Sequence, residues 1–173
     1  MGTPYDDLLT RRSIRAYLDR QVPEDLLEKV LEAGLYAPTA RDNQKAQMVV
    51  IQDPDTLADL EALNAQEMTS AGGNPFYGAP TCIIVFADAE DKNWIQDGSL
   101  VMGNLMNAAH SLGLGSCWIN RAMEVFDGPE GKAYMEKWGI PAHYRAVANC
   151  ILGYVKGDAP TAHPRKEGRI KRF

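Results

Sequence analysis

Residues 94–112 read WIQDGSLVMGNLMNAAHSL, a long stretch that combines apolar residues with helical spacing. Apolar side chains would lie on most sides of the helix it predicts, and Gly113 ends that helix. Such a helix belongs in the middle of a protein or at a subunit interface. Polar residues interrupt the stretch at several positions, so we do not expect it to span a membrane.

Helical and strand patterns alternate on both sides of this central helix. Further helices are predicted at residues 4–10, 23–37, 55–68 and 129–138. Strands are predicted at residues 46–52, 81–88, 115–120 and 145–155. Residues 69–80 are rich in turn-forming residues, and no repeat or linker divides the chain. Because helices separate most strands, the sequence predicts a single α+β unit.

Basic residues gather near the two ends of an otherwise acidic chain. The formal net charge is −5, yet residues 11–20 and 165–172 hold 9 of the 18 basic residues and only 2 of the 23 acidic ones. Nonspecific nucleic-acid binding needs an extended basic face, so we expect no nucleic-acid partner. Two compact basic segments fit a small anion better, provided that the fold brings them together. For the tail, a solvated terminal segment remains the alternative.

The sequence lacks the usual motifs of several other classes. It contains no GxGxxG, no GxxxxGK[ST] and no GxSxG. Its three cysteines lie far apart and form no CxxC or Cys/His cluster, which indicates buried reduced thiols rather than a metal site. The first ten residues are polar and acidic, unlike a secretory signal. We therefore expect a soluble cytoplasmic protein with no membrane partner.

Six short motifs follow one another along nearly the whole chain. They are RRSIR (11–15), APTARDNQ (37–44), GAP (78–80), AAHSLGLGSCWI (108–119), ILGY (151–154) and PRK (164–166). In this order and spacing they resemble the FMN-dependent nitroreductase family, and the short chain resembles its compact members. The resemblance implies one FMN-binding domain over residues 1–173. It also implies a mixed central β-sheet flanked by helices, a long buried central helix and an extended C-terminal tail.

The resemblance assigns the basic residues to the cofactor. The implied ligands of the flavin phosphate and ribityl chain are Arg11, Ser13, Arg165 and Lys166. Charge-assisted hydrogen bonds of this kind are roughly twice as strong as neutral ones. Arg15 matches a basic position at the pyrimidine edge of the flavin ring, where a cation favours the reduced form. Arg12 belongs to the same motif, and its side chain either contacts the cofactor or pairs at the surface.

A second group of implied flavin contacts comes from the other subunit of a homodimer. Pro38, Thr39 and Ala40 match the family loop that reaches the flavin across the subunit interface. A third group passes one face or edge of the ring and comprises Cys117, Trp118, Ile119 and Asn120. Many family members carry Glu-Gly after the isoleucine, whereas this chain has Asn120-Arg121, a change that alters the polarity offered to a substrate.

The loop after Ala40 departs from the family pattern. The family continues with Asn, one further residue, Gln, Pro and Trp. This sequence has Asp42 at the Asn position, keeps Gln44 and replaces Pro-Trp with Lys45-Ala46. Asn43 fits the Asn position only if the loop shifts by one residue. Asp42, Asn43 and Gln44 therefore all remain candidate flavin contacts.

The implied function needs no catalytic side chain, because the flavin N5 carries the chemistry and Arg15 tunes the flavin. NADH or NADPH is the expected electron donor, in a ping-pong mechanism. The expected acceptor is an electron-poor small molecule: a nitroarene, a quinone, an enone or a flavin. The loop 64–79 is expected to shape the open face that receives it. The alternative is a non-catalytic FMN-binding module that senses redox state.

Overall fold

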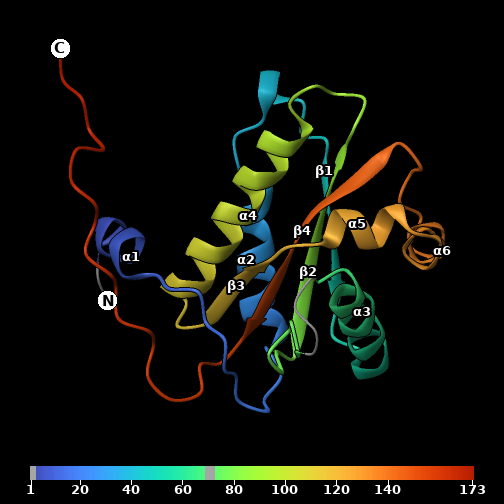
Figure 1. Ribbon diagram of the computed structural model, residues 1–173, viewed down its shortest axis with the longest axis horizontal. Helices are drawn as coiled ribbons and strands as arrows, with labels where there is room; N and C mark the ends of the chain where they lie inside the picture. Colours follow the sequence, from blue (N-terminus) through green and yellow to red (C-terminus); the bar gives the residue numbers. More distant parts are fainter. Residues whose placement is uncertain (1–2, 69–72) are drawn as a thin grey trace.

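The computed structural model describes residues 3–68 and 73–173, and a four-stranded antiparallel sheet lies at its centre (Figure 1). The strands are β1 (Ala46–Ile51), β2 (Thr81–Asp88), β3 (Gly115–Ile119) and β4 (Tyr144–Gly153). Their order across the sheet is β1-β2-β4-β3, and all three neighbouring pairs are antiparallel. The mixed sheet expected from the resemblance is therefore antiparallel among its named strands. The parallel element is an isolated bridge between Ser13 and Ser116.

Helices cover both faces of this sheet (Figure 1). The helices are α1 (Pro4–Thr10), α2 (Glu24–Leu35), α3 (Pro54–Gln66), α4 (Trp94–Ser111), α5 (Ala122–Asp127) and α6 (Pro129–Lys137), with a short 3₁₀ turn η1 (Ala40–Asp42). α2 and α4 pack against one face, and α3, α5 and α6 against the other. Among the described residues, no helix is long and apolar enough to cross a membrane.

The core has two halves because β2 is buried along its whole length. Ile83 and Val85 belong to the cluster that includes α2 and α4. Ile84 and Phe86 belong to the cluster that includes α3, α5 and α6. A strand with both faces covered reads as a continuous apolar run, which is why TCIIVFAD lacks alternation.

The central helix α4 is buried along one side only in this chain. Val101, Met102 and Leu105 lie in the core, whereas the side chains of Ile95 and Leu100 are 47% and 46% exposed. A partner subunit is thus needed to bury α4 on most sides, and that expectation stays a prediction. The chain after Val155 forms no helix or strand. It runs away from the sheet toward α1 (Figure 1).

The predicted helices and strands are present, with bounds shifted by one or two residues. The helix predicted at 55–68 begins earlier, at Pro54, because Asp53 caps it and proline suits the first helical position. Sequence patterns missed α5 and η1, which are short. Of the turn-rich stretch 69–80, residues 69–72 lie outside the described part, and residues 73–80 form no helix or strand.

Candidate functional site

The arginine segment, residues 11–17, is held beside the edge strand β3. The backbone N–H of Ile14 donates to the Ser116 carbonyl at 3.0 Å. Isolated bridges join Ser13 to Ser116 and Tyr17 to Val155. The segment therefore extends the sheet at β3 and places its arginines along that edge. Two cavities lie along this pair of segments, one near Arg11 and one near Arg15.

The Arg11 cavity, defined here by its lining residues Arg11, Arg12, His110, Ser116 and Ala159, has a volume of about 220 Å³. Arg11 Nη1 and Ser116 Oγ are buried and have no hydrogen-bond partner. A buried polar group without a partner costs about 1–3 kcal/mol, and more when it is charged. A guanidinium and a hydroxyl beside one cavity form a receptor for an anionic oxygen ligand.

Arg12 serves the local backbone instead. Its Nη1 donates to the carbonyl oxygens of Leu9, at 2.9 Å, and Arg11, at 2.7 Å. These carbonyls lie at the C-terminal end of α1, where backbone acceptors lack helical partners. Arg12 Nε is buried without a partner and faces the same region. Arg12 is therefore first a helix cap, and its Nε is a further buried donor without a partner.

The Trp118 cavity has a volume of about 250 Å³ and is lined by residues from four parts of the chain. They are Arg15, Asn64, Met68, Pro75, Tyr77, Cys117, Trp118, Ile119, Asn120 and Arg121. Five of these were predicted from sequence: Arg15, Cys117, Trp118, Ile119 and Asn120. The structure thus brings Arg15 and the end of β3 together, as the resemblance implied. No acidic residue is among the lining residues that the structure describes.

Asn64 is a site residue that the sequence reading missed. Its side chain is only 1% exposed, and its Oδ1 accepts from Asn149 Nδ2 at 3.1 Å. Its own Nδ2 is buried without a partner beside the Trp118 cavity. The signal was available, because Asn64 continues the stripe of Leu57 and Leu60 at helical spacing. An amide on the buried stripe of a helix indicates a polar partner.

Backbone strain is concentrated at two places. Among the described residues, five that are not glycine have a positive φ: Arg41, Asp42, Gln44, Tyr77 and Arg121. Three lie in the loop at residues 38–44, and the other two line the Trp118 cavity. Left-handed backbone at non-glycine residues costs about 1–3 kcal/mol and clusters at functional sites. Both segments singled out from the sequence therefore carry strain.

The loop at residues 38–44 lies at the opposite end of α4 from the Arg11 cavity (Figure 1). The Ala40 backbone N–H donates to Asp97 Oδ1 at 3.0 Å, in the first turn of α4. In the last turn, His110 Nε2 lies 2.8 Å from Thr10 Oγ1 beside the Arg11 cavity. The 13 residue steps of α4 from Asp97 to His110 separate these two contacts by about 20 Å. One chain's loop therefore does not reach that chain's own Arg11 cavity.

Within the loop, the side chains that depart from the family pattern bind to their neighbours. Asp42 Oδ1 accepts from Gln44 Nε2 at 3.0 Å, and Asn43 Nδ2 donates to Asp91 Oδ2 at 3.0 Å. Lys45 Nζ lies 2.8 Å from Asp88 Oδ2, and this hydrogen bond lowers the pKa of that carboxyl. Hydrogen bonds within this chain, including contacts to residues 88–97, thus hold the loop in its conformation. Thr39 and Gln44 also line a third cavity, of about 180 Å³.

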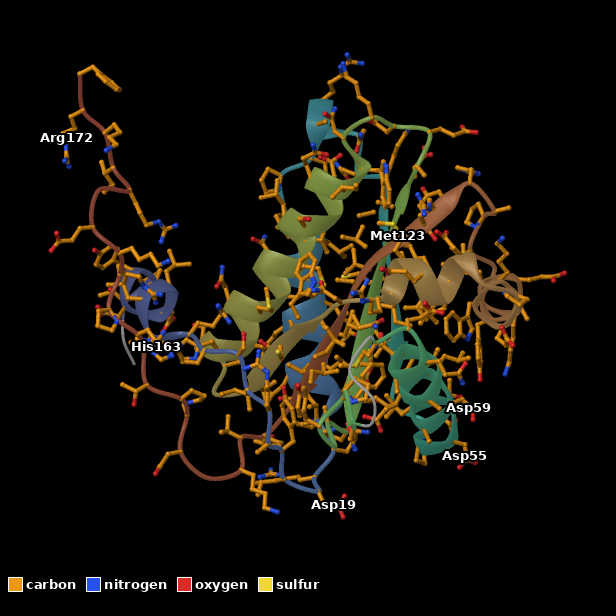
Figure 2. The ribbon with its side chains drawn as sticks, in the orientation of Figure 1. Asp19, Asp55, Asp59, Met123, His163 and Arg172 are labelled. Carbon is orange, nitrogen blue, oxygen red and sulfur yellow. The ribbon has the colours of Figure 1, made fainter. Side chains whose placement is uncertain are left out.

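Arg165 and Lys166 are exposed in the tail. They line a shallow hollow formed by residues 165–170 alone, whereas the Arg11 cavity receives Ala159 as its tail residue. Figure 2 shows Arg172 at the outer end of the tail, away from the sheet. Within one chain, the structure does not bring the two basic ends to one cavity. Their joint action on a phosphate stays a prediction.

The three cysteines are free and buried. Burial raises the pKa of the Cys150 thiol to about 12 and also raises that of Cys82. Both thiols are therefore protonated at neutral pH and act as small apolar side chains. Cys117 is 1% exposed and lines the Trp118 cavity.

Comparison with known proteins matches these features to one family. The model of the nitroreductase family matches residues 8–154. A Methanothermobacter thermautotrophicus protein named "Putative NADH dehydrogenase/NAD(P)H nitroreductase" is 34% identical over 149 residues, which cover 84% of this chain and 73% of that protein. The Bacillus subtilis protein named "FMN reductase [NAD(P)H]" is 27% identical over 188 residues, which cover 95% of this chain and 70% of that protein.

A solved structure gives the same result. The crystal structure of a nitroreductase with bound FMN from Bacteroides fragilis superposes with a TM-score of 0.91 at 28% identity, and the match covers 100% of both chains. This agreement supports the fold of an antiparallel four-stranded sheet with helices. The chain belongs to the nitroreductase family.

Proposed function

We propose that this chain is an FMN-dependent oxidoreductase that passes electrons from NADH or NADPH to an electron-poor small molecule. The acceptor is a nitroarene, a quinone, an enone or a flavin, and donor and acceptor use the site in turn. The observation that carries the proposal is the buried, partnerless Arg11 Nη1 beside Ser116 Oγ, on the same edge as the Trp118 cavity. Residues 1–173 act as one FMN-binding domain.

The residues fit FMN in charge and in shape. FMN carries a phosphate at one end of a ribityl chain and a planar ring at the other. The Arg11 cavity supplies partnerless buried donors for an anionic oxygen, and the Trp118 cavity supplies an indole and an amide donor. Four residues of extended chain separate Arg11 from Arg15, about 13 Å. FMN fits this arrangement better than FAD, because the described chain offers no Rossmann glycines for an adenosine diphosphate.

A homodimer completes the proposed site. The loop at residues 38–44 contacts α4 at Asp97, about 20 Å along the helix from the Arg11 cavity of its own chain, and in the proposed dimer it contributes to the cofactor of the second copy. Exposed apolar side chains on α2 and α4 fit an interface between copies: Leu35 is 67% exposed, and Ile95 and Leu100 are nearly half exposed. A stable obligate interface commonly buries more than about 2,000 Å².

Bound FMN would supply the redox chemistry. The chain's own residues bind, orient and bias it. Arg11 and Ser116 hold the anionic end in place, and Asn64 offers its free Nδ2 within the Trp118 cavity. Arg15 places a positive charge at that cavity, which favours added negative charge there. Three free cysteines suit a reducing compartment, so we place the protein in the cytoplasm.

The test is an absorption spectrum of the purified protein before and after anaerobic addition of NADH and then NADPH. The proposal predicts a flavin spectrum that bleaches with at least one donor, and FMN on mass analysis of the released cofactor. Steady-state oxidation of the same donor with a nitroarene or a quinone should follow.

Each other outcome has a distinct meaning. A yellow protein that never bleaches with either nicotinamide would support the redox-sensing module instead of the enzyme. Release of FAD alone would contradict the assignment of the Arg11 cavity. A colourless protein that ignores added FMN would contradict the proposed function as a whole.

A further inference from the structure

We propose that Arg121 makes the Trp118 cavity a receptor for an anionic group on a substrate, and so acts as a specificity-determining residue. The ligand chemistry is a planar aromatic or nicotinamide body with a carboxylate or phosphate attached. This inference rests on the proposed function, because it names the class of substrate that enters the same site.

The backbone at Arg121 holds an arginine where glycine would be unstrained. Arg121 follows β3 and is the N-terminal cap residue of α5, with φ 78° and ψ 4°. Glycine adopts this left-handed conformation without steric cost, whereas other residues are strained there. The side chain therefore stands at the cavity despite the local conformation, and a functional role is one reason for such an outlier.

Glu124 orients the Arg121 side chain but leaves some of its hydrogen-bond donors free. Arg121 Nη1 donates to Glu124 Oε1 at 2.6 Å, and the side chain is 42% exposed. A guanidinium has five N–H donors, and this contact engages one nitrogen. Glu124 is not among the described lining residues, and its contact offsets part of the positive charge of Arg121. The neighbouring Asn120 does not engage the Arg121 guanidinium, since its Oδ1 accepts a hydrogen bond from Trp118 Nε1 at 2.6 Å.

The charge at the cavity opposes the charge of the whole chain. The described lining contains two arginine residues, Arg15 and Arg121, and no acidic residue. The chain as a whole has a net charge of −5. A concave site lined by one sign of charge concentrates ligands of the opposite sign. In the proposed function the flavin ring would lie in this cavity beside Trp118 and Ile119, and the planar body of such a ligand would stack on that ring.

Two sources offer this chemistry: an anionic substituent on the acceptor, or the phosphates of the nicotinamide donor. The test uses Arg121→Gly, which removes the charge and relieves the strained backbone, and Arg121→Gln, which keeps a polar side chain. The matched control is Arg145→Gln, because Arg145 is also half-exposed and paired with an acid, Asp127, outside this cavity.

A binding measurement comes first. FMN-loaded protein is titrated calorimetrically with benzoate and with neutral benzamide. The wild type and Arg145→Gln should bind benzoate more tightly than benzamide. Both Arg121 variants should lose about fivefold in affinity for benzoate, and their affinity for benzamide should stay unchanged. The variants should retain their FMN content. Arg121→Gln should keep the Tm of the wild type, and Arg121→Gly should have a Tm that is no lower, because glycine relieves the left-handed backbone.

Kinetics then separates the two sources. The acceptor arm compares 4-nitrobenzoate with 4-nitrobenzamide at fixed NADH. The donor arm compares NADH with a benzyl dihydronicotinamide, which lacks phosphates, at a fixed neutral acceptor. A rise in KM confined to nitrobenzoate assigns Arg121 to the acceptor, and one confined to NADH assigns it to the donor. FMN-loaded wild type that binds benzoate and benzamide equally would overturn the role of Arg121, whereas protein without FMN would overturn the proposed function.

Discussion

The arginine segment and the loop at residues 38–44 occupy opposite ends of the same helix, and they differ in what surrounds them. At the C-terminal end of α4, buried donors of Arg11 and Ser116 face a cavity and lack partners. At the N-terminal end, Asp42, Asn43 and the Ala40 N–H all have partners within the chain. The Arg11 cavity thus has buried donors that a ligand can satisfy, whereas the polar groups of the loop at residues 38–44 are already satisfied within the chain.

This difference suits the Arg11 cavity and the loop at residues 38–44 to different roles in binding. A preformed loop keeps its shape without a ligand and is suited to be presented to another molecule. A cavity with unsatisfied buried donors is suited to receive one. We infer that each chain supplies both parts to a homodimer, the cavity to its own cofactor and the loop to its partner's.

The largest expected effect comes from Arg11→Ala. Removing a charged, buried donor should lower FMN affinity by about one to two decades, from about 1.5–3 kcal/mol for a charged hydrogen bond. Fluorescence titration with FMN measures it. Arg12→Ala is the comparison variant. Arg12 lines the same cavity, but its Nη1 caps α1, so its removal should lower the Tm more and the FMN affinity less than Arg11→Ala does. Equal FMN losses in both variants would contradict this division of roles.

The same FMN titration tests whether the C-terminal tail contributes to the phosphate site. If Lys166 acts on the same phosphate, Lys166→Ala weakens FMN binding, and the Arg11→Ala Lys166→Ala double variant loses less than the sum of the single losses. The same titration in all four proteins gives the coupling. Small losses that add strictly would mean that the tail is a solvated segment.

A smaller effect is expected from Asp97→Ala at the loop. Asp97 is 5% exposed, and its Oδ1 accepts the Ala40 N–H. Losing this charge-assisted bond, about 1.5 kcal/mol, should free the loop and weaken FMN binding about tenfold. Asp97→Asn keeps an acceptor and should lose less. If both variants bind FMN like the wild type, the loop does not contribute to the cofactor.

The smallest effect on affinity is expected from Arg15→Gln, which separates tuning from binding. A cation near the ring favours the reduced flavin, so its removal should lower the midpoint potential measurably. FMN affinity should fall much less than in Arg11→Ala. Anaerobic potentiometry on both variants checks this. An unchanged potential with a large loss of affinity would place Arg15 at the phosphate instead.

Much of the fold is readable from the sequence, because its long elements carry strong patterns. The spacing within α4 and the continuous apolar run of β2 predict a helix and a strand where the structure has them. β2 is buried along its whole length, whereas the burial of α4 on most sides stays a prediction. The six-residue helix α5 escaped notice, since its cap residue, Arg121, makes no side-chain capping bond that a motif would reveal. Short helices depend on tertiary packing rather than on local signals.

The site was only partly readable. The resemblance placed Arg15 and the end of β3 together, and they share a cavity. Asn64 was missed although it lies on an apolar helical stripe, and its role depends on Asn149, which is 85 residues away in sequence. The left-handed backbone of Arg121 has no sequence signature outside glycine. Contacts between distant segments and strained backbone conformations become visible only in a three-dimensional structure.

The central claim is that each FMN takes Arg11 from one chain and the loop at residues 38–44 from the other. Two differently tagged chains test it most directly, one with Arg11→Ala and one with Ala40→Glu, purified separately and as a mixed dimer. Each parent homodimer lacks an intact site and should bind FMN poorly. The mixed dimer should regain one tight FMN, because one of its two sites combines the undamaged Arg11 and the undamaged loop. A mixed dimer that binds FMN as poorly as both parents, or a flavin-loaded monomer, would contradict the account.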